Sequence, residues 1–493
     1  MSPRSAAPTS ASAMESPIVV ASNRGPVSFE RDADGRLFPR RGSGGLVTAL
    51  AGVFDRDDAV WLSAAMSDGD REVAAGGRAI ESGSPLRLRF IEIPPERYDG
   101  YYNGVANGLL WFAHHFLWDI ARSPSFGDDT ERAWESYVEA NRAFAKALAE
   151  EPDPNTVFLV QDYHLSLVPA MLRELRPEAK IVHFSHTPFA GPTYLRILPA
   201  HVRAAILRGL AGADVVGFQA RIWVENFLLS ARDAPGMKVL RGGRLSVDGR
   251  AALVRSFPVA VDAPAIRDTA AAPETVAIRE ELRAWKADAS LLLRVDRMEP
   301  SKNILRGFHA FELFLRRNPS WRGKVRFLAL STPSREDLPP YRDYADECLA
   351  EVARINGEFA TEDWVPITVR LQEDYAFAVG AYGVYDALLV NPLYDGMNLV
   401  AMEGPLVNPR RGVLILSRNA GAFSRLGRHA IAVNPFDLNE SAAAIKAALE
   451  MSAEERLRRS RGLQRSVLAN TPPGWLASQL RAMDLARPPG PSS

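Results

Sequence analysis

The fold is decided by three apolar runs within residues 156–218: Thr156-Val157-Phe158-Leu159-Val160, Lys180-Ile181-Val182-His183-Phe184 and Asp214-Val215-Val216-Gly217-Phe218. Between these runs, apolar residues recur at helical spacing over Leu167–Arg173 and His201–Leu210. Strands that are apolar on both faces and alternate with helices are typical of a parallel sheet covered by helices. This stretch therefore predicts an α/β domain.

The same alternation continues outward in both directions. Pro17–Ala21 is an earlier apolar run, and Phe257–Val261 is expected to be the last strand of the first half. Residues 262–275 are rich in Ala and interrupted by Pro, which indicates a linker. The pattern then restarts, with apolar runs at Leu291–Val295, Val325–Leu330, Ile367–Leu371, Ala387–Val390 and Val413–Leu416.

These boundaries predict two doubly wound, Rossmann-like domains, residues 17–262 and residues 275–470. We expect them to face a deep cleft, because such sheets bind ligands at the carboxyl ends of their strands. A helix over residues 471–486 is expected to follow and to be able to cross back to the first domain. Residues 1–16 are mostly Ser, Ala, Pro and Thr, which predicts a disordered tail, and residues 486–491 are expected to be equally loose.

Composition excludes several classes of protein. The 493 residues include 59 Lys and Arg against 59 Asp and Glu, which argues against a general nucleic-acid binder. No apolar run reaches the roughly 18 residues that a membrane helix needs. A single cysteine, Cys348, allows neither an internal disulfide nor a cysteine zinc site. We therefore expect a reduced, cytoplasmic protein, with a homo-oligomer left open.

Residues with useful chemistry follow strands in the second half. Arg297 and Lys302 can hold adjacent phosphates, although a solvated basic turn would show the same spacing. Asp395-Gly396-Met397-Asn398-Leu399 is expected to open a helix whose N–H groups suit an anion, with Asp395 as an ordinary helix cap as the alternative. Glu403, which follows Leu399 by one helical turn, can accept hydrogen bonds from a ribose diol.

The first half offers a second set of candidates. Asp162 and His186 end adjacent predicted strands, so a carboxylate and an imidazole can converge on one ligand. His183 is expected to be a hydrogen-bonded core residue, and no metal is expected because no third ligand is spaced to help. The glycine-rich stretch Arg41–Leu46 fits a loop near a sugar or phosphate and equally a plain loop. Neither a serine elbow nor Cys348 supports covalent catalysis.

Taken together, these residues resemble the trehalose-6-phosphate synthases, retaining glycosyltransferases of the two-domain GT-B fold. The likeness runs from about Pro17 to Ala486 and rests on the order and spacing of short motifs. The motifs are Ser22-Asn23-Arg24, Ser43-Gly44-Gly45-Leu46, Tyr101-Tyr102-Asn103 with Leu110-Trp111, Asp162-Tyr163-His164-Leu165, His186-Thr187-Pro188-Phe189, Arg297 with Lys302, Ser334-Arg335, and Asp395-Gly396-Met397-Asn398-Leu399-Val400 with Glu403.

The resemblance implies a role for each matched residue. The acceptor, glucose 6-phosphate, would be held by Arg24, Tyr102, Trp111, Asp162 and Arg335, with both arginines on its phosphate. The nucleotide-glucose donor would be held by Gly45, His186, Arg297, Lys302, Asp395, Gly396, Met397, Asn398, Leu399 and Glu403. Catalysis would fall to Asp162, His186, Arg297, Lys302 and Asp395, by transfer on the front face of the sugar without a metal or cofactor.

Departures from the family pattern leave alternatives open. The chain has Arg297-Met298-Glu299-Pro300-Ser301-Lys302-Asn303 where the family commonly has Arg-Leu-Asp-Tyr-x-Lys-Gly, Tyr394 where it has Arg, and Ala64 in place of a tryptophan. Several of these lean toward a GDP-using relative, the pseudo-glycosyltransferase validoxylamine 7′-phosphate synthase, whereas Met397 and the Gly-Gly-Leu loop match the true synthases. We therefore favour glucosyl transfer from GDP-glucose over UDP-glucose. Cyclitol coupling and a catalytically silent sugar-phosphate sensor are the alternatives.

Overall fold

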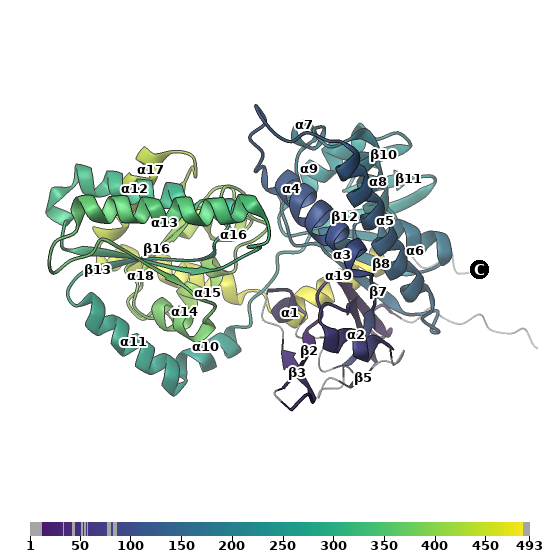
Figure 1. The fold of residues 1–493 in the computed structure, drawn as a ribbon, viewed down its shortest axis with the longest axis horizontal. Helices are drawn as coiled ribbons and strands as arrows, with labels where there is room; N and C mark the ends of the chain where they lie inside the picture. Colours follow the sequence, from purple (N-terminus) through teal and green to yellow (C-terminus); the bar gives the residue numbers. More distant parts are fainter. Residues whose placement is uncertain are drawn as a thin grey trace, which may run out of the picture. The chain divides into compact units, whose positions relative to one another are not determined.

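The computed structural model describes residues 12–32, 34–41, 45–50, 53, 56, 58–75, 80–81 and 86–486. The chain divides into two compact units (Figure 1). The first comprises Met1–His114, Trp118–Phe257 and Pro472–Ser493, and the second comprises His115–Leu117 and Pro258–Thr471.

A largely parallel sheet forms the centre of the first unit. In its described residues the strand order is β10-β11-β12-β9-β8-β7-β1-β4-β6-β5. The parallel strands are β1 (Ile18–Ser22), β4 (Ala59–Ala64), β6 (Arg87–Ile91), β7 (Val157–Gln161), β8 (Lys180–Ser185), β9 (Val215–Phe218) and β12 (Arg250–Ser256). β1, β4, β7 and β9 are buried along their whole length, as strands covered on both faces should be.

Helices and short strands complete the first unit. α5 (Asp128–Ala149), α6 (Val168–Leu175) and α8 (Ala200–Ala211) pack together, and α19 (Pro472–Ala486) packs on β8, β9 and β12. The stretch around residues 236–250 is a hairpin of β10 (Met237–Leu240) and β11 (Arg244–Val247). The other elements are β2 (Val27–Arg31), β3 (Leu37–Arg41), α1 (Gly45–Ala49), α2 (Asp68–Ala75), β5 (Ile80–Glu81), α3 (Pro95–Asp99), the π-helix η2 (Gly100–Leu110), α4 (Trp111–His115), η3 (Tyr163–Leu165), α7 (Pro192–Leu195) and α9 (Arg221–Arg232).

The second unit is a doubly wound parallel sheet. Its order β15-β14-β13-β16-β17-β18 reverses direction between β13 (Ser290–Arg297) and β16 (Ala387–Val390), and ligands bind at such a switch point. The other strands are β14 (Val325–Thr332), β15 (Ile367–Leu371), β17 (Val413–Ser417) and β18 (Ile431–Val433). In Figure 1 the sheet lies between one layer with α12 (Ile304–Arg317), α13 (Pro339–Phe359) and α17 (Leu438–Leu449) and another with α11 (Pro273–Lys286), α14 (Tyr375–Tyr382), α15 (Val400–Val407) and α18 (Ala453–Leu468). The short elements are η4 (Pro300–Lys302), η5 (Pro319–Trp321), α16 (Phe423–Leu426) and η6 (Gly427–His429).

Two sequence predictions near the end of the first sheet are wrong. The predicted linker, residues 262–275, is helical, with α10 (Ala263–Ala271) ending just before α11 begins. Its prolines stand in the first turn of each helix, where a missing N–H costs no hydrogen bond, and the Asp262 side chain caps α10 by accepting from the N–H of Ala265 at 3.0 Å. The predicted strand Phe257–Val261 has no regular structure, because Pro258 cannot donate to a sheet and β12 ends before it.

Part of the predicted disordered tail, residues 12–16, lies within the described residues. Residues 1–11 and 487–493 lie outside the described residues. Ala13, however, is buried and its N–H donates to a carboxylate oxygen of Asp484 on α19 at 3.1 Å, so the end of the predicted tail is ordered.

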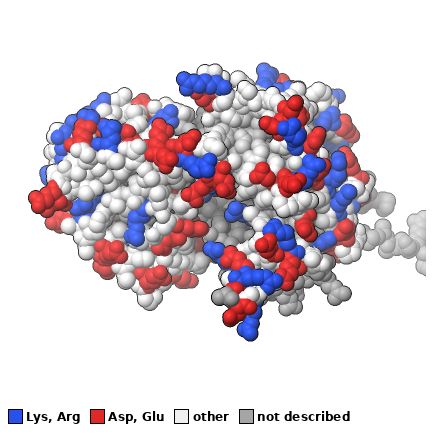
Figure 2. All heavy atoms as spheres, in the orientation of Figure 1, with Lys and Arg blue, Asp and Glu red and all other residues white. Residues whose placement is uncertain are grey.

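Surface charge and helix length relate to two classes that the composition argued against, nucleic-acid binders and membrane-spanning proteins. Figure 2 shows Lys and Arg interspersed with Asp and Glu over the face that it draws. Among the described residues no helix is both long and apolar enough to span a lipid bilayer.

Candidate functional site

Asp162 and His186 are in direct contact at the strand ends of the first unit. Asp162 follows β7, His186 follows β8, and the His186 N–H donates to Asp162 Oδ1 at 3.1 Å. Asp162 has a φ of 71° and a ψ of 170°, a backbone conformation that is costly for any residue except glycine. The predicted convergence of these two residues is therefore present.

Neighbouring groups hold the strained backbone of Asp162. Its N–H donates to the carbonyl of Phe184 at 2.7 Å, and its carbonyl accepts from the N–H of Leu165 at 3.1 Å. The same carbonyl lies 3.2 Å from Nε2 of His183, which is fully buried. Burial lowers the pKa of His183 to about 4, so the imidazole is neutral and donates through Nε2. His183 lies in the core, as predicted.

His186 is a neutral hydrogen-bonding group. Burial, and secondarily the neighbouring His183, lowers its pKa to about 3. Its Nε2 lies 3.1 Å from Oε1 of Gln161, and its Nδ1 lies 3.4 Å from Nε2 of Gln219. With these amide orientations Nε2 carries the hydrogen and Nδ1 accepts. The motifs did not identify either glutamine, although each lies at or just beyond the end of a buried strand.

An aromatic stack connects Arg24 to Asp162. Arg24 is exposed and its Nη2 lies 3.5 Å from the Tyr102 hydroxyl. The Tyr102 ring stacks on His164, with ring centroids 5.7 Å apart, and His164 Nδ1 lies 4.0 Å from Asp162 Oδ2. Tyr102 also belongs to the π-helix η2, a rare element that is frequent at functional sites. Arg24, Tyr102, Asp162 and His186 are thus brought together.

Trp111 and Gly45 are the other two predicted site residues of the first unit. Trp111 is only 6% exposed and packs against Tyr163 at a centroid distance of 5.8 Å, so in this structure it supports the stack rather than facing solvent. Gly45 is the first residue of α1. The preceding Ser43 and Gly44 of the predicted loop lie outside the described residues.

In the second unit Lys302 and Asp395 form a buried ion pair across the switch point. Lys302 Nζ lies 2.6 Å from Asp395 Oδ2, and each side chain is 14% exposed. Burial opposes both charges, but the neighbouring groups together outweigh it, with the ion-pair partner foremost, so the pKa of Lys302 is raised and that of Asp395 is lowered. The alternative of a solvated basic turn is therefore wrong for Lys302.

The loop after Asp395 is also held differently from a simple helix cap. Asn398, at a φ of 78°, caps the helix: its Oδ1 accepts from the N–H of Ala401 at 3.2 Å, and its Nδ2 donates to Asp395 Oδ2 at 3.2 Å. Leu399 directly precedes α15, which begins only at Val400, so the predicted helix start is corrected by several residues. The alternative of Asp395 as the cap is wrong.

Close backbone packing fixes the same loop. A Cβ on Gly421 would lie 1.8 Å from the carbonyl oxygen of Gly396, so only glycine fits there. The Met397 side chain is buried, and its carbonyl accepts from the N–H of Ala422 at 2.9 Å. The loop is therefore rigidly positioned beside Lys302.

Glu299 joins the two predicted phosphate-binding arginines of this unit. It is fully buried, and its Oε1 accepts from Arg297 Nη2 at 3.2 Å and from the Ser301 hydroxyl at 2.8 Å. Its Oε2 accepts from Arg335 Nη1 at 2.8 Å. Burial opposes ionisation, but Arg297 and Arg335 outweigh it and hold the pKa of Glu299 at about 2. The motif analysis missed Glu299, although it stands between the two cations of its own motif.

A buried arginine supports the loop that carries Lys302. Arg294 on β13 donates from Nη2 to the carbonyl of Lys302 at 2.7 Å and to Oδ1 of Asn391 at 2.9 Å. Its Nε donates to Asp296 Oδ2 at 2.9 Å. Because Arg294 is wholly shielded from solvent, it acts on the loop and not on a ligand.

Glu403 is a partly buried carboxyl on α15. Burial raises its pKa to about 7, and the Tyr382 hydroxyl, 3.3 Å from Oε2, only partly offsets this. After burial, the charge of Glu403 is the next cause that raises the pKa of both Tyr375 and Tyr382 on α14. A carboxyl in this state suits a ligand that brings hydroxyl donors.

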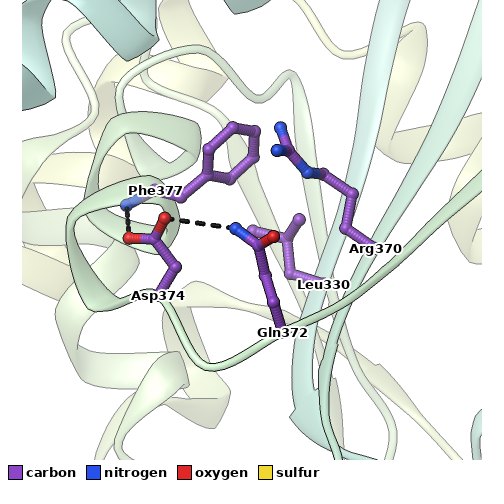
Figure 3. A pocket seen from close by; sticks show the side chains of 5 residues that line it. All are labelled: Leu330, Arg370, Gln372, Asp374 and Phe377. Carbon is purple, nitrogen blue, oxygen red and sulfur yellow. Dashed lines mark hydrogen bonds between the residues drawn. The ribbon is translucent and has the colours of Figure 1, made fainter.

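A small pocket that the motifs did not identify lies past the carboxyl ends of β14 and β15 (Figure 3). Its lining residues are Leu330, Arg370, Gln372, Asp374 and Phe377. The guanidinium carbon of Arg370 lies 3.8 Å from the centroid of the Phe377 ring, and the Gln372 amide donates to Asp374 Oδ2 at 3.2 Å. The pocket thus combines a flat platform with both donors and a carboxylate.

Backbone strain and metal ligands give two further observations. Among the described residues, four of the eight non-glycine residues with positive φ are Asp162, Asn303, Arg335 and Asn398. Strain of this kind gathers at functional sites, which supports a functional role for the strand ends of both units.

Within the described residues no group of three or more His, Cys, Asp or Glu side chains could hold a metal ion.

Comparison with known proteins gives consistent matches. Residues 16–484 match the family described as Glycosyltransferase family 20. A protein named trehalose-6-phosphate synthase from Mycobacterium avium is 36% identical over 484 residues, covering 95% of each chain. A probable alpha,alpha-trehalose-phosphate synthase [UDP-forming] 2 from Arabidopsis thaliana is 32% identical over 461 residues, and the match covers 93% of this chain but only 56% of that protein.

A solved structure extends the match to three dimensions. It is an alpha,alpha-trehalose-phosphate synthase (UDP-forming) from Burkholderia xenovorans in complex with glucose-6-phosphate. It superposes with a TM-score of 0.83 at 28% identity, covering 95% of this chain and 99% of that one. The predicted α/β fold class and the predicted family resemblance are both confirmed. The chain belongs to glycosyltransferase family 20.

Proposed function

We propose that this protein transfers glucose from a nucleoside-diphosphate glucose to glucose 6-phosphate and forms α,α-trehalose 6-phosphate. The observation that carries the proposal is the group of fixed cations, Arg297, Lys302 and Arg335, around the switch point of the second unit. Names of family relatives support the reaction, and the complex with glucose-6-phosphate supports the acceptor.

In this proposal the second unit holds the donor. Arg297 and Lys302 bind the diphosphate, whose negative charge grows as the bond between glucose and phosphate breaks. Cations that are already fixed before the reaction stabilise this charge without reorganisation. Asp395 keeps Lys302 in place and accepts hydrogen bonds from the sugar, and Glu403 accepts from the ribose hydroxyls.

The first unit supplies the groups for the acceptor. Arg24 binds the phosphate of glucose 6-phosphate together with Arg335, and Tyr102 and Asp162 lie against the sugar hydroxyls. Neutral His186 lies by the 6-hydroxyl of the donor sugar. The acceptor hydroxyl attacks the face from which the diphosphate departs, its proton passes to the leaving phosphate, and the α configuration is retained.

We further propose GDP-glucose as the preferred donor. The support lies in the sequence, where several departures from the common family pattern, among them Glu299-Pro300-Ser301 and Tyr394, lean toward the GDP-using relative. The words "UDP-forming" in relatives' names favour UDP-glucose instead.

One experiment tests both parts. Purified protein is incubated with glucose 6-phosphate and ADP-, GDP- or UDP-glucose, and the product is analysed by NMR. We expect an α,α-linked disaccharide phosphate, formed with the highest kcat/KM from GDP-glucose. A higher kcat/KM with UDP-glucose would overturn the base preference alone. No disaccharide phosphate with any of the donors would overturn the proposed reaction.

A further inference from the structure

The second unit contains one carboxylate that contacts two phosphate-binding arginines. Arg297 lies at the end of β13 and Arg335 follows β14, and both donate to Glu299, one to each oxygen. The two arginines therefore cannot move independently of Glu299. In the proposed function Arg297 binds the donor and Arg335 binds the acceptor. Glu299 therefore contacts one arginine from each substrate site.

Burial separates the role of Glu299 from the roles of the arginines. The Glu299 side chain is 0% exposed, whereas that of Arg297 is 44% and that of Arg335 is 11% exposed. Glu299 thus lies beneath the guanidinium groups and does not reach a ligand itself. The Ser301 hydroxyl donates to the same oxygen that receives Arg297, which fixes the carboxylate plane.

Arg335 needs such support more than an ordinary surface arginine. Its backbone has a φ of 50°, which disfavours this residue type, and its guanidinium carbon lies 5.3 Å from the centroid of the Tyr341 ring. A long side chain that both an aromatic ring and a carboxylate hold in place loses little freedom when an anion binds. The geometry therefore favours two arginines that are positioned before either substrate arrives.

We propose that Glu299 is a positioning residue that orients Arg297 and Arg335 together, so that one carboxylate sets the affinity for both phosphate-bearing substrates. This inference rests on the proposed function, because it uses the assignment of Arg335 to the acceptor phosphate. It predicts that a single change at Glu299 weakens donor and acceptor binding at once, whereas a change at either arginine weakens mainly one.

The test measures binding of GDP, of UDP in parallel, and of glucose 6-phosphate by calorimetry to the full-length protein. For Glu299→Gln we expect the Kd values of nucleotide and sugar phosphate both to rise by about tenfold or more, since charge-assisted contacts are lost at both sites. Glu299→Asp keeps the charge but withdraws it by about one C–C bond, roughly 1.5 Å. It is expected to fold if the glutamine variant does not, and to weaken both ligands by a smaller factor.

A double-mutant cycle separates positioning from general damage. In an Arg335→Ala background, Glu299→Gln or Glu299→Asp should weaken glucose 6-phosphate no further but still weaken the nucleotide. Asp386→Asn is the matched control, because Asp386 is also a buried carboxylate paired with an arginine but precedes β16 at the opposite end of the sheet. It should lower the melting temperature and leave both Kd values within about twofold.

The outcomes are distinguishable. If the wild-type protein binds both ligands but each Glu299 variant weakens only one or neither, the inference is overturned and the proposed function stands. If the Asp386 control weakens both ligands equally, the effect is global and the inference is also overturned. If the wild-type protein binds no glucose 6-phosphate, the proposed function itself fails and the inference falls with it.

Discussion

The strand ends of the two units are built from opposite kinds of interaction. In the first unit Asp162 contacts three histidines, His164, His183 and His186, and its backbone is strained. In the second unit Lys302 pairs with Asp395, and the buried Glu299 pairs with Arg297 and Arg335. Hydrogen bonds to imidazole and carboxylate groups suit sugar hydroxyls, and fixed cations suit phosphates, and the substrates that we propose carry both kinds of group.

The largest effect is expected from breaking the ion pair of Lys302 with Asp395. Lys302→Met should lower kcat by on the order of 10²–10³, as loss of one fixed charge-stabilising donor does. It should also destabilise the fold by about 3–5 kcal/mol, because Asp395 is left as an unpaired buried charge. Steady-state kinetics and thermal unfolding check these two effects.

A double variant distinguishes the two consequences of that change. Lys302→Met combined with Asp395→Asn removes both charges and should recover most of the stability but none of the activity. Recovery of activity in the double variant would contradict a direct role of Lys302 in the reaction.

A change at Asp162 should lower activity without lowering stability. Asp162→Gly relieves an unfavourable φ, so the melting temperature should stay level or rise. Activity should nevertheless fall by about 10² or more, since the carboxylate that orients the acceptor is lost. Asp162→Asn is the control, because it removes the carboxylate charge but keeps a side chain at this unfavourable φ. Equal loss of stability and activity in the glycine variant would argue against stored strain at this position.

A smaller effect is expected at His183. His183→Phe removes the donor to the Asp162 carbonyl and should raise the KM for glucose 6-phosphate about tenfold, the value of one buried hydrogen bond. His183→Gln places an amide near the position of Nε2 and should restore much of this loss. The KM for the donor should change little in both variants. A parallel rise in both KM values would indicate general unfolding instead.

The smallest effect concerns pH. The pKa of Glu403, raised to about 7 by burial, lies above its ordinary value, so folding favours the protonated form. Stability from this group is therefore present at low pH and declines as pH rises toward the folded pKa. Donor binding to the carboxylate should improve over the same range, and kcat/KM for the donor should rise through about pH 7. Glu403→Gln should remove that titration, and an unchanged profile would exclude Glu403 as its source.

The fold was predictable because its strands are apolar on both faces. Runs such as Thr156–Val160 and Leu291–Val295 lie within or overlap β7 and β13. The linker over residues 262–275 was mispredicted because Pro264 and Pro273 can start a helix as well as break one, and position within a turn is invisible before the helix is known.

The site was predictable where motif residues carry the chemistry. Asp162 and His186 are paired as their strand-end positions suggest, whereas the ion pair of Lys302 with Asp395 was not predicted. Glu299, Arg294 and Gln219 were missed because each also bonds a residue that follows another strand, namely Arg335, Asn391 and His186, and sequence spacing holds no information about those contacts. Residues that position other side chains are therefore harder to predict from sequence than residues that bind a ligand.

The most direct test of the account is nucleoside diphosphate release by the wild-type protein. With nucleotide-glucose we predict rapid release when glucose 6-phosphate is present and little release without it or with glucose 1-phosphate in its place. Release that is equally fast with glucose 1-phosphate, or that needs no acceptor, would contradict the central claim that the protein transfers glucose specifically to glucose 6-phosphate.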